Sequence, residues 1–252
     1  MSEIASQLSE VLLQQDFHAE AGCCKGEAKC RWLAKSYSVV ENAIAVLSDM
    51  HSDRSTVYYG EFARTLGLQQ SSANQQIESI WEDEILSRLH PDDLDRKYLF
   101  ELRFFHFIKQ CPKSKRNEYY LSEKLRMRDA HDNYVLVHHR MFYFHSPSSR
   151  SILFALCLYA PLVGDMPEDG SIINSVTGET CKLDGSNDNS ILTAREKEIL
   201  ALINQGLSSK HIADRLFISV NTVSRHRQNI LEKLNVRNSV EACRRAKELR
   251  LI

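Results

Sequence analysis

The order of apolar and polar positions predicts that the chain begins with helices and then becomes rich in strands. Apolar residues at helical spacing predict an amphipathic helix over residues 3–15. Residues 21–30 show no clear period, so we expect a loop there, followed by one or two helical turns over 32–37. The segments 43–50 and 56–60 are separated by a polar run, and this arrangement is typical of a hairpin.

A long helix followed by three strands is predicted in the middle of the chain. The signals for the start of a helix are clearest over residues 88–110, where Pro91 fits the first helical position and two acidic residues follow it. Before this helix we expect a short helix over 61–68 and a polar connector over 69–76. After it, three β-prone stretches separated by turn residues predict an antiparallel meander: residues 118–129, 133–145 and 150–162.

The last quarter of the chain has a different pattern. Residues 164–190 carry Gly, Pro, Asp, Asn and Ser and predict a linker, within which 171–183 can form a small hairpin. Residues 191–252 are helical in pattern throughout. The predicted fold class is therefore α+β: an antiparallel sheet with helices over residues 1–163, linked to an all-α domain over 191–252.

Capping residues divide the C-terminal part into short helices. Thr193 and Glu196 have the spacing of a capping box, and Gly206 suits the position that ends the same helix. Residues 208–217 predict a second, very short helix, and Ser219 is a natural N-cap for a third. Two short helices joined by so tight a turn form a helix-turn-helix pattern.

The third helix has two unlike sides on a helical wheel. Its apolar side is formed by Val220, Val223, Ile230, Leu231 and Leu234. Its opposite side carries Asn221, Ser224, Arg225, Gln228, Asn229 and Glu232. Asn, Ser, Arg and Gln can hydrogen-bond base edges, whereas a merely solvated helix more often carries Glu/Lys pairs. Arg227 falls on the apolar side, where we expect its stem to pack and its head to reach water or an acid such as Glu198. A contact with DNA is the alternative for this arginine.

Charge is divided unevenly along the chain. The formal net charge is −1, yet residues 191–252 hold 12 Lys+Arg and 6 Asp+Glu, and the first 190 residues hold 20 and 27. A basic C-terminal piece favours a polyanionic partner for that piece alone, although chance variation of the surface is an equal alternative on charge alone.

The C-terminal segment "LTAREKEILALINQGLSSKHIADRLFISVNTVSRHRQNILEKLNVRNSVEA" resembles the DNA-binding domain of LuxR/NarL-type transcription regulators. This resemblance covers about 60 residues. It implies a four-helix helix-turn-helix domain whose third helix enters the major groove of double-stranded DNA. It also implies that the fourth helix can mediate dimerisation, so a homodimer is expected.

By position, the resemblance assigns base contacts to Ser224, Arg225 and Gln228. Phosphate contacts fall to Lys210, Asn221, Thr222 and Lys233. Phosphate contacts supply affinity and base-edge contacts supply specificity. The sequence departs from the family at Ser224, where many members have Lys, and at His211, where Glu is usual. His226 corresponds to a wedge between the third helix and the backbone, and a packed, hydrogen-bonded histidine is the alternative.

Residues 43–162 are similar to a PAS domain, through "LHPDDLDR" before the long helix and "KLRMRDAHDNYVLVHHRMFYF" after it. The resemblance implies a sensor or dimerisation module. A phosphoacceptor receiver would need parallel strands, and the ligand set of an acyl-homoserine-lactone sensor cannot be placed. His106 could ligate haem or simply be packed or exposed. The reactive Cys motif of flavin-binding PAS domains is absent. Cys23, Cys24 and Cys30 could serve a metal or redox role or be inert.

These features together predict a sequence-specific DNA-binding transcription regulator whose PAS-like domain receives a signal or mediates dimerisation. The alternative is a ligand- or partner-binding signalling protein whose C-terminal helices make protein contacts. Because G-x-S-x-G, Gly-rich phosphate loops and H-E-x-x-H are missing from the sequence, we expect no enzyme activity, and we assign no cofactor or metal. With no apolar run of about 18 residues and no signal-peptide pattern, a cytoplasmic protein without a membrane span is expected. A small-molecule ligand can be accommodated in the PAS-like domain.

Overall fold

The computed structural model describes most of the chain. The described residues are 3–17, 24–68, 74–146, 149, 151–167, 170–183, 192–234, 236–248 and 251–252. The chain divides into two compact units. The first consists of Met1–Leu102 and Cys111–Cys181, and the second of Arg103–Gln110 and Lys182–Ile252.

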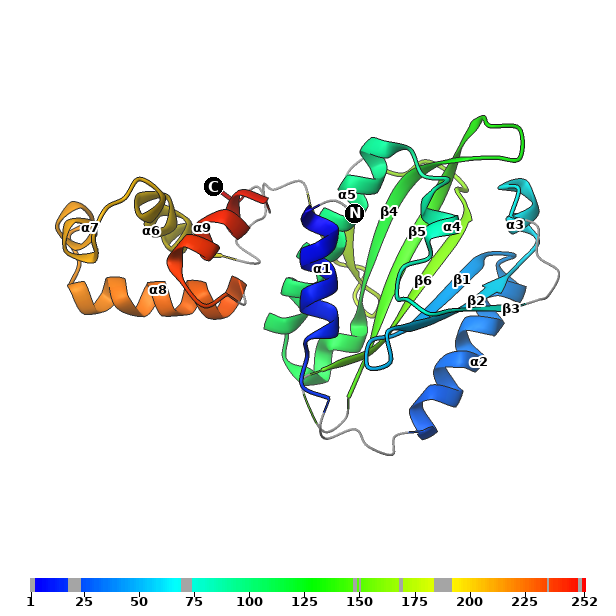
Figure 1. Ribbon diagram of the computed structural model, residues 1–252, viewed down its shortest axis with the longest axis horizontal. Helices are drawn as coiled ribbons and strands as arrows, with labels where there is room; N and C mark the ends of the chain where they lie inside the picture. Colours follow the sequence, from blue (N-terminus) through cyan, green and yellow to red (C-terminus); the bar gives the residue numbers. More distant parts are fainter. Residues whose placement is uncertain are drawn as a thin grey trace. The chain divides into compact units, whose positions relative to one another are not determined.

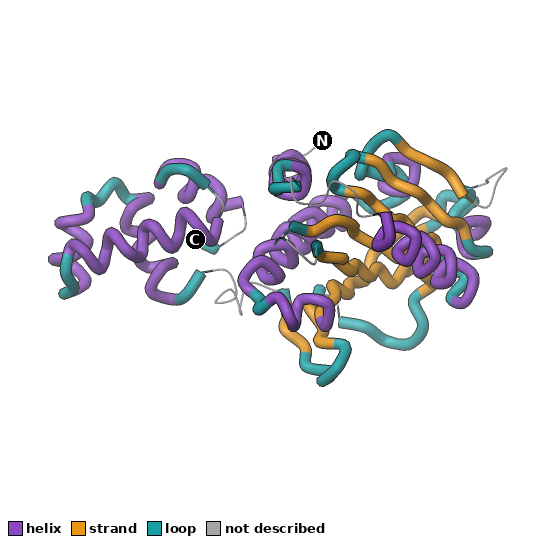
Figure 2. The backbone as a smooth tube through the Cα atoms, turned by 90° about the horizontal axis from the view of Figure 1, so that it is seen from below, coloured by secondary structure: helices purple, strands orange, loops and turns teal. Residues whose placement is uncertain are grey.

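The first unit is built on one eight-stranded sheet (Figure 2). The strands are β1 (Ile44–Asp49), β2 (Arg54–Tyr59), β3 (Asn74–Ile77), β4 (Tyr119–Arg128), β5 (Tyr134–His145), β6 (Ile152–Pro161), β7 (Ser171–Asn174) and β8 (Thr180–Lys182). Their order across the sheet is β3-β2-β1-β6-β5-β4-β7-β8. The expected hairpin is the antiparallel pair β1–β2, and the expected meander is β4–β5–β6, so both predictions are confirmed.

Helices cover both faces of this sheet (Figure 1). The helices of this part of the chain are α1 (Glu3–Leu13), α2 (Cys24–Val40), α3 (Phe62–Thr65), α4 (Asp83–Leu86), α5 (Pro91–Gln110) and the 3-10 helix η2 (Lys113–Glu118). The residues of α5 from Arg103 on belong to the second unit. Helix α2 packs Cys30 and Ala34 against Ala45 of β1 and Leu156 of β6. Helix α5 faces the opposite side of the sheet, where Glu101 lies near His139 of β5.

Two local predictions for the first unit are wrong. Helix α2 occupies part of the stretch expected to be a loop, and its packing against the sheet supplies the stabilisation that its weak pattern does not indicate. Strand β3 lies at the end of the connector expected over 69–76, where it pairs with β2 at the edge of the sheet. Its side chains are exposed or half-buried, so its sequence lacks the alternation of apolar and polar residues that predicts a strand.

Strands β7 and β8 occupy the stretch in which a small hairpin was expected. Because β7 pairs with β4, this stretch extends the sheet. Domain boundaries at residues 163 and 190 stay predictions.

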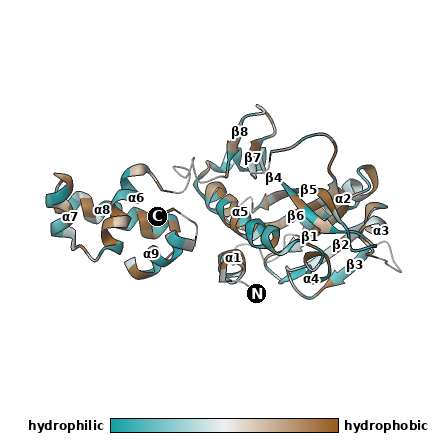
Figure 3. Ribbon diagram, turned by 90° about the horizontal axis from the view of Figure 1, so that it is seen from above, coloured by the Kyte–Doolittle hydropathy of each residue, from teal (hydrophilic) through white to brown (hydrophobic). Residues whose placement is uncertain are grey.

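The second unit contains the four helices of the C-terminal segment. These are α6 (Ala194–Asn204), α7 (Ser209–Leu216), α8 (Val220–Leu234) and α9 (Ser239–Glu248). Their buried centre includes Leu200, Ile212, Val223 and Ala246, and α8 carries both hydrophobic and hydrophilic residues along its length (Figure 3). The predicted α+β class is therefore confirmed. No helix in the described ranges is long and apolar enough to cross a bilayer.

Candidate nucleic-acid interface

Helix α6 begins and ends as its sequence predicts. The Thr193 hydroxyl accepts a hydrogen bond from the Glu196 backbone N–H at 3.3 Å, and the Glu196 carboxylate accepts one from the Thr193 N–H at 2.8 Å. Gly206 follows the helix with φ of +85°, and its N–H donates to the Ile203 carbonyl. A capping box therefore fixes the start of α6, and a left-handed glycine fixes its end.

Three residues separate α7 from α8. Phe217 adopts a left-handed conformation (φ 54°, ψ 44°), which reverses the chain direction immediately after α7. The Ile218 N–H donates to the Ala213 carbonyl at 3.0 Å. The Ser219 hydroxyl then accepts the Thr222 N–H at 3.0 Å, so Ser219 is the N-cap of α8 as predicted. Helices α7 and α8 with this turn form a helix-turn-helix.

Most of the predicted apolar side of α8 is buried. Val223, Ile230 and Leu234 are at most 1% exposed, and Leu231 is half-buried. Val220 is 45% exposed, so its predicted burial is wrong. As the first residue of α8, it has no preceding helical turn to cover it. Three buried positions on one side of the helix thus fix which side faces outward.

The three predicted base-contact residues share the outward side of α8. Ser224, Arg225 and Gln228 are all exposed, and the first and last are separated by about 6 Å along the helix axis. The Gln228 side chain makes a 3.4 Å hydrogen bond to Glu232. Arg225 forms no ion pair with a carboxylate in the described part of the chain. Its guanidinium is therefore available to an external acceptor.

The predicted phosphate-contact residues lie in different environments. Asn221, Thr222 and Lys210 are exposed near the start of α8 or α7. Lys233 is half-buried, and its Nζ lies 2.7 Å from Oε2 of Glu196, the capping-box carboxylate. Burial would raise the pKa of Glu196, but hydrogen bonds from Lys233 and Thr193 outweigh it and lower that pKa. Lys233 is thus held by an acid of its own domain.

Arg227 connects three helices. Its guanidinium donates to the Ser209 hydroxyl of α7 at 3.0 Å and to the Ser239 hydroxyl of α9 at 2.9 Å. The expected packing of the stem agrees with its half-buried state. The suggested partner Glu198 is wrong, because Glu198 pairs with Arg195 at 2.6 Å. No spacing rule links Arg227 to these two serines, so the sequence offers no indication of the contact.

The remaining predictions concern two histidines and three cysteines. His226 is half-buried, and its Nδ1 is buried without a hydrogen-bond partner in the described ranges, so that atom lacks the bond proposed in the packed alternative. His106 lies on α5 and is buried. Burial raises the pKa of the Cys30 thiol to about 11, which suits an inert side chain. Cys23 lies outside the described residues, as does the side chain of Cys24.

The geometry of α6 to α9 defines a helix-turn-helix domain, in which α8 is the second helix of the motif. Residues 190–246 match the family described as "Bacterial regulatory proteins, luxR family". The C-terminal domain is therefore a LuxR-family DNA-binding domain, as its resemblance predicted.

Known proteins are similar in sequence to part of this chain. The Oxygen regulatory protein NreC of Staphylococcus carnosus (strain TM300) is 37% identical over 95 residues, which cover 35% of this chain and 44% of that protein. The Transcriptional regulatory protein DesR of Bacillus subtilis (strain 168) is 49% identical over 57 residues, covering 23% and 29%. The chain thus spans less than half the length of either relative.

Solved structures of low similarity cover more of the chain. A Vibrio cholerae VqmA dimer, described as a LuxR-type receptor, is 15% identical and covers 86% of each chain with a TM-score of 0.32. A phage VqmA–DPO complex is 14% identical with a TM-score of 0.32, covering 88% of this chain and 89% of that one. Scores this low do not establish a shared overall fold.

Proposed function

We propose that this protein is a sequence-specific transcription regulator that binds double-stranded DNA through α8. The observation that carries the proposal is the outward side of α8, where Ser224, Arg225 and Gln228 are exposed and Arg225 has no carboxylate partner among the described residues. An α-helix of this kind fits the major groove, which is about 12 Å wide. Binding rather than catalysis is the role this surface supports.

Within this proposal, different residues supply specificity and affinity. Arg225 and Gln228 offer hydrogen-bond donors that base edges can accept, and Ser224 offers a hydroxyl. Lys210, Asn221 and Thr222 are exposed at the helix starts, where backbone phosphates would lie. Lys233 can contribute to phosphate binding only while it also satisfies Glu196.

The first unit is the proposed input module. The five strands in the order β2-β1-β6-β5-β4, with α5 between β2 and β4 in the chain, suit the PAS-like arrangement expected from the sequence. A cavity of about 650 Å³ lies between α2 and the sheet, lined by aromatic residues that include Tyr37, Phe142 and Phe144. Its size suits a small molecule. A change in this unit would alter the spacing of two α8 helices in a homodimer, which would meet half-sites about one DNA turn apart.

The test is a binding screen with the full chain against a pool of DNA duplexes, followed by titrations at several salt concentrations. The wild-type protein should select a sequence motif and bind more weakly as salt rises. Arg225→Ala should lose about 1–3 kcal/mol of discrimination at one position of the motif. Arg215, which is exposed on α7 and outside the proposed contact set, supplies the control Arg215→Ala.

Lys210→Ala distinguishes the phosphate contribution in the same screen. It should weaken binding to all sequences alike and reduce the salt dependence by about one phosphate contact. Binding that is absent or insensitive to salt would overturn the proposal and favour the alternative, in which the C-terminal helices contact protein. Identical sequence profiles for Arg225→Ala and Lys210→Ala would contradict the division of roles.

A further inference from the structure

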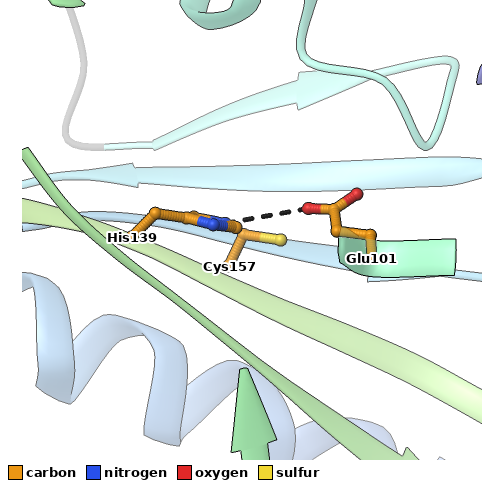
Figure 4. Close-up of side chains that lie close together, drawn as sticks. All are labelled: Glu101, His139 and Cys157. Carbon is orange, nitrogen blue, oxygen red and sulfur yellow. Dashed lines mark ion pairs between the residues drawn. The ribbon is translucent and has the colours of Figure 1, made fainter. Parts of the chain in front are cut away.

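Three potential metal ligands converge inside the first unit, and none of them belongs to the helices of the proposed DNA-binding domain (Figure 4). Glu101 comes from α5, His139 from β5 and Cys157 from β6. Their exposed fractions are 2%, 0% and 5%. One ligand atom of each lies within 4.8 Å of the other two. Three separate segments therefore bring an oxygen, a nitrogen and a sulfur to one enclosed point.

The His139 ring is oriented by a second carboxylate. Its Nδ1 lies 2.9 Å from Oε1 of Glu123, a side chain that is also fully buried. In the tautomer with the proton on Nδ1, this nitrogen donates to the Glu123 carboxylate and the lone pair is on Nε2. Metal-binding histidines in proteins are typically held in this way by a carboxylate on their other nitrogen.

The free nitrogen of His139 points into the cluster. Nε2 is 3.8 Å from Oε1 of Glu101, beyond hydrogen-bond distance, and no partner for it is present in the described ranges. Leaving a buried ring nitrogen unsatisfied costs about 1–3 kcal/mol, so such an atom in a folded protein needs an explanation. A bound ion would satisfy this nitrogen.

Acidic and basic side chains both surround the cluster. Lys97 of α5 pairs with Glu101, with 2.7 Å between Nζ and Oε1. Glu123 and Glu82 are buried nearby, and Glu82 accepts a hydrogen bond from Tyr159 at 2.6 Å. Two further basic side chains act on these groups, Arg96 on Glu123 and Arg140 on His139. A divalent cation at the cluster would be attracted by the buried carboxylates and repelled by Lys97.

We propose that Glu101, His139 and Cys157 bind one divalent transition-metal ion of the Zn²⁺ type. Imidazole, thiolate and carboxylate together are the ligands Zn²⁺ takes in proteins, whereas Mg²⁺ and Ca²⁺ prefer oxygen alone. In tetrahedral coordination, ligand atoms about 2.1 Å from the metal are about 3.4 Å apart, so the 3.8 Å separation of Nε2 and Oε1 needs only a small side-chain rotation. On binding, the Cys157 thiol releases its proton to solvent and coordinates as thiolate.

The test uses the full chain stripped of metal with a chelator and titrated with Zn²⁺ and, separately, Co²⁺. We expect one equivalent to bind and the thermal midpoint to rise, because the ion joins α5 to two strands. Co²⁺ should give a thiolate-to-metal charge-transfer band in the near ultraviolet. Mg²⁺ should produce neither effect, and equal stabilisation by Mg²⁺ would overturn the proposal.

Cys157→Ser and Cys30→Ser form a matched pair. Both cysteines are 5% exposed, but Cys30 belongs to α2, which packs against the opposite face of the sheet. Cys157→Ser should abolish the charge-transfer band and weaken Zn²⁺ binding at least about tenfold, whereas Cys30→Ser should leave both unchanged. If circular dichroism shows that Cys157→Ser does not fold, His139→Gln takes its place. This variant is expected to lose the one equivalent of bound Zn²⁺.

Several outcomes would reject the site. Wild-type protein that binds no stoichiometric Zn²⁺ would reject it, as would a charge-transfer band that survives Cys157→Ser. Loss of the band in Cys30→Ser alone would place the ion at the N-terminal cysteines instead. None of these outcomes depends on DNA binding, so the metal site and the proposed function are tested separately.

Discussion

Lys233 at the end of α8 forms an ion pair with Glu196 at the start of α6, with 2.7 Å between Nζ and Oε2. The same carboxylate closes the capping box of α6 by accepting the Thr193 N–H. One buried acid thus connects α8 to α6, the first helix of the domain. A residue matched by resemblance to a phosphate contact therefore also has a structural role.

Lys233→Met is expected to lower the free energy of unfolding of the C-terminal domain by about 1–2 kcal/mol, because it leaves the 3% exposed Glu196 side chain without its cation. Chemical denaturation followed by far-ultraviolet circular dichroism measures the change. Lys210→Met, at an exposed position, is the control and should stay within about 0.5 kcal/mol of wild type. Equal stabilities for the two variants would show that the ion pair does not support the domain.

Arg227→Met should destabilise the same domain by about 1–3 kcal/mol, since it removes the two hydrogen bonds that a charged guanidinium makes to Ser209 and Ser239. Methionine keeps much of the packed aliphatic stem, so the loss of stability measures the contribution of the guanidinium group. Arg225→Met, two residues earlier on the exposed side, is the matched control for stability. A loss of DNA affinity without any loss of stability in Arg227→Met would instead assign this arginine to the DNA surface.

Lys97→Met is expected to cost about 3–5 kcal/mol of stability in chelator-treated protein, because the buried Glu101 would lose its cation. The double variant Lys97→Met with Glu101→Leu removes both charges and should recover most of that loss. Urea denaturation of the two single variants and the double variant gives the coupling between the residues. Additive losses would mean that the two side chains act independently.

Stability at acidic pH should depend on Asp93. Its carboxylate accepts the Arg126 backbone N–H at 2.7 Å and the Arg126 Nε at 2.9 Å. Burial raises the pKa of Asp93, but these hydrogen bonds and the neighbouring Arg96 outweigh burial, so the folded pKa is below the ordinary value. Its stabilisation is therefore complete above about pH 4, the unfolded pKa, and is lost as pH falls through the folded pKa.

The measurement is the free energy of unfolding of wild type and Asp93→Asn between neutral pH and pH 3. The variant should be less stable at neutral pH and should lose less stability on acidification. Asp92→Asn, at a position with an 80% exposed side chain on the same helix turn, is the control. If wild type and Asp93→Asn lost equal amounts of unfolding free energy on acidification, Asp93 would not be a source of the acid sensitivity.

Local sequence patterns predicted the elements whose stability is local. The caps Thr193, Gly206 and Ser219 satisfy backbone groups within three or four residues, so the helices of the C-terminal domain could be located before their packing was known. Alternating and β-prone stretches likewise located β4, β5 and β6. The outward side of α8 followed from the wheel because Val223, Ile230 and Leu234 must be buried together.

The tertiary structure decided what depends on segments far apart in the chain. Packing against the sheet makes α2 a helix, and pairing with β2 makes residues 74–77 a strand. Only the folded chain brings Arg227 to two serines and Lys233 to Glu196, and only the folded chain assembles Glu101, His139 and Cys157. The physical reason is that capping and periodicity act over one helical turn. The partners of a buried polar side chain are set by how whole elements pack.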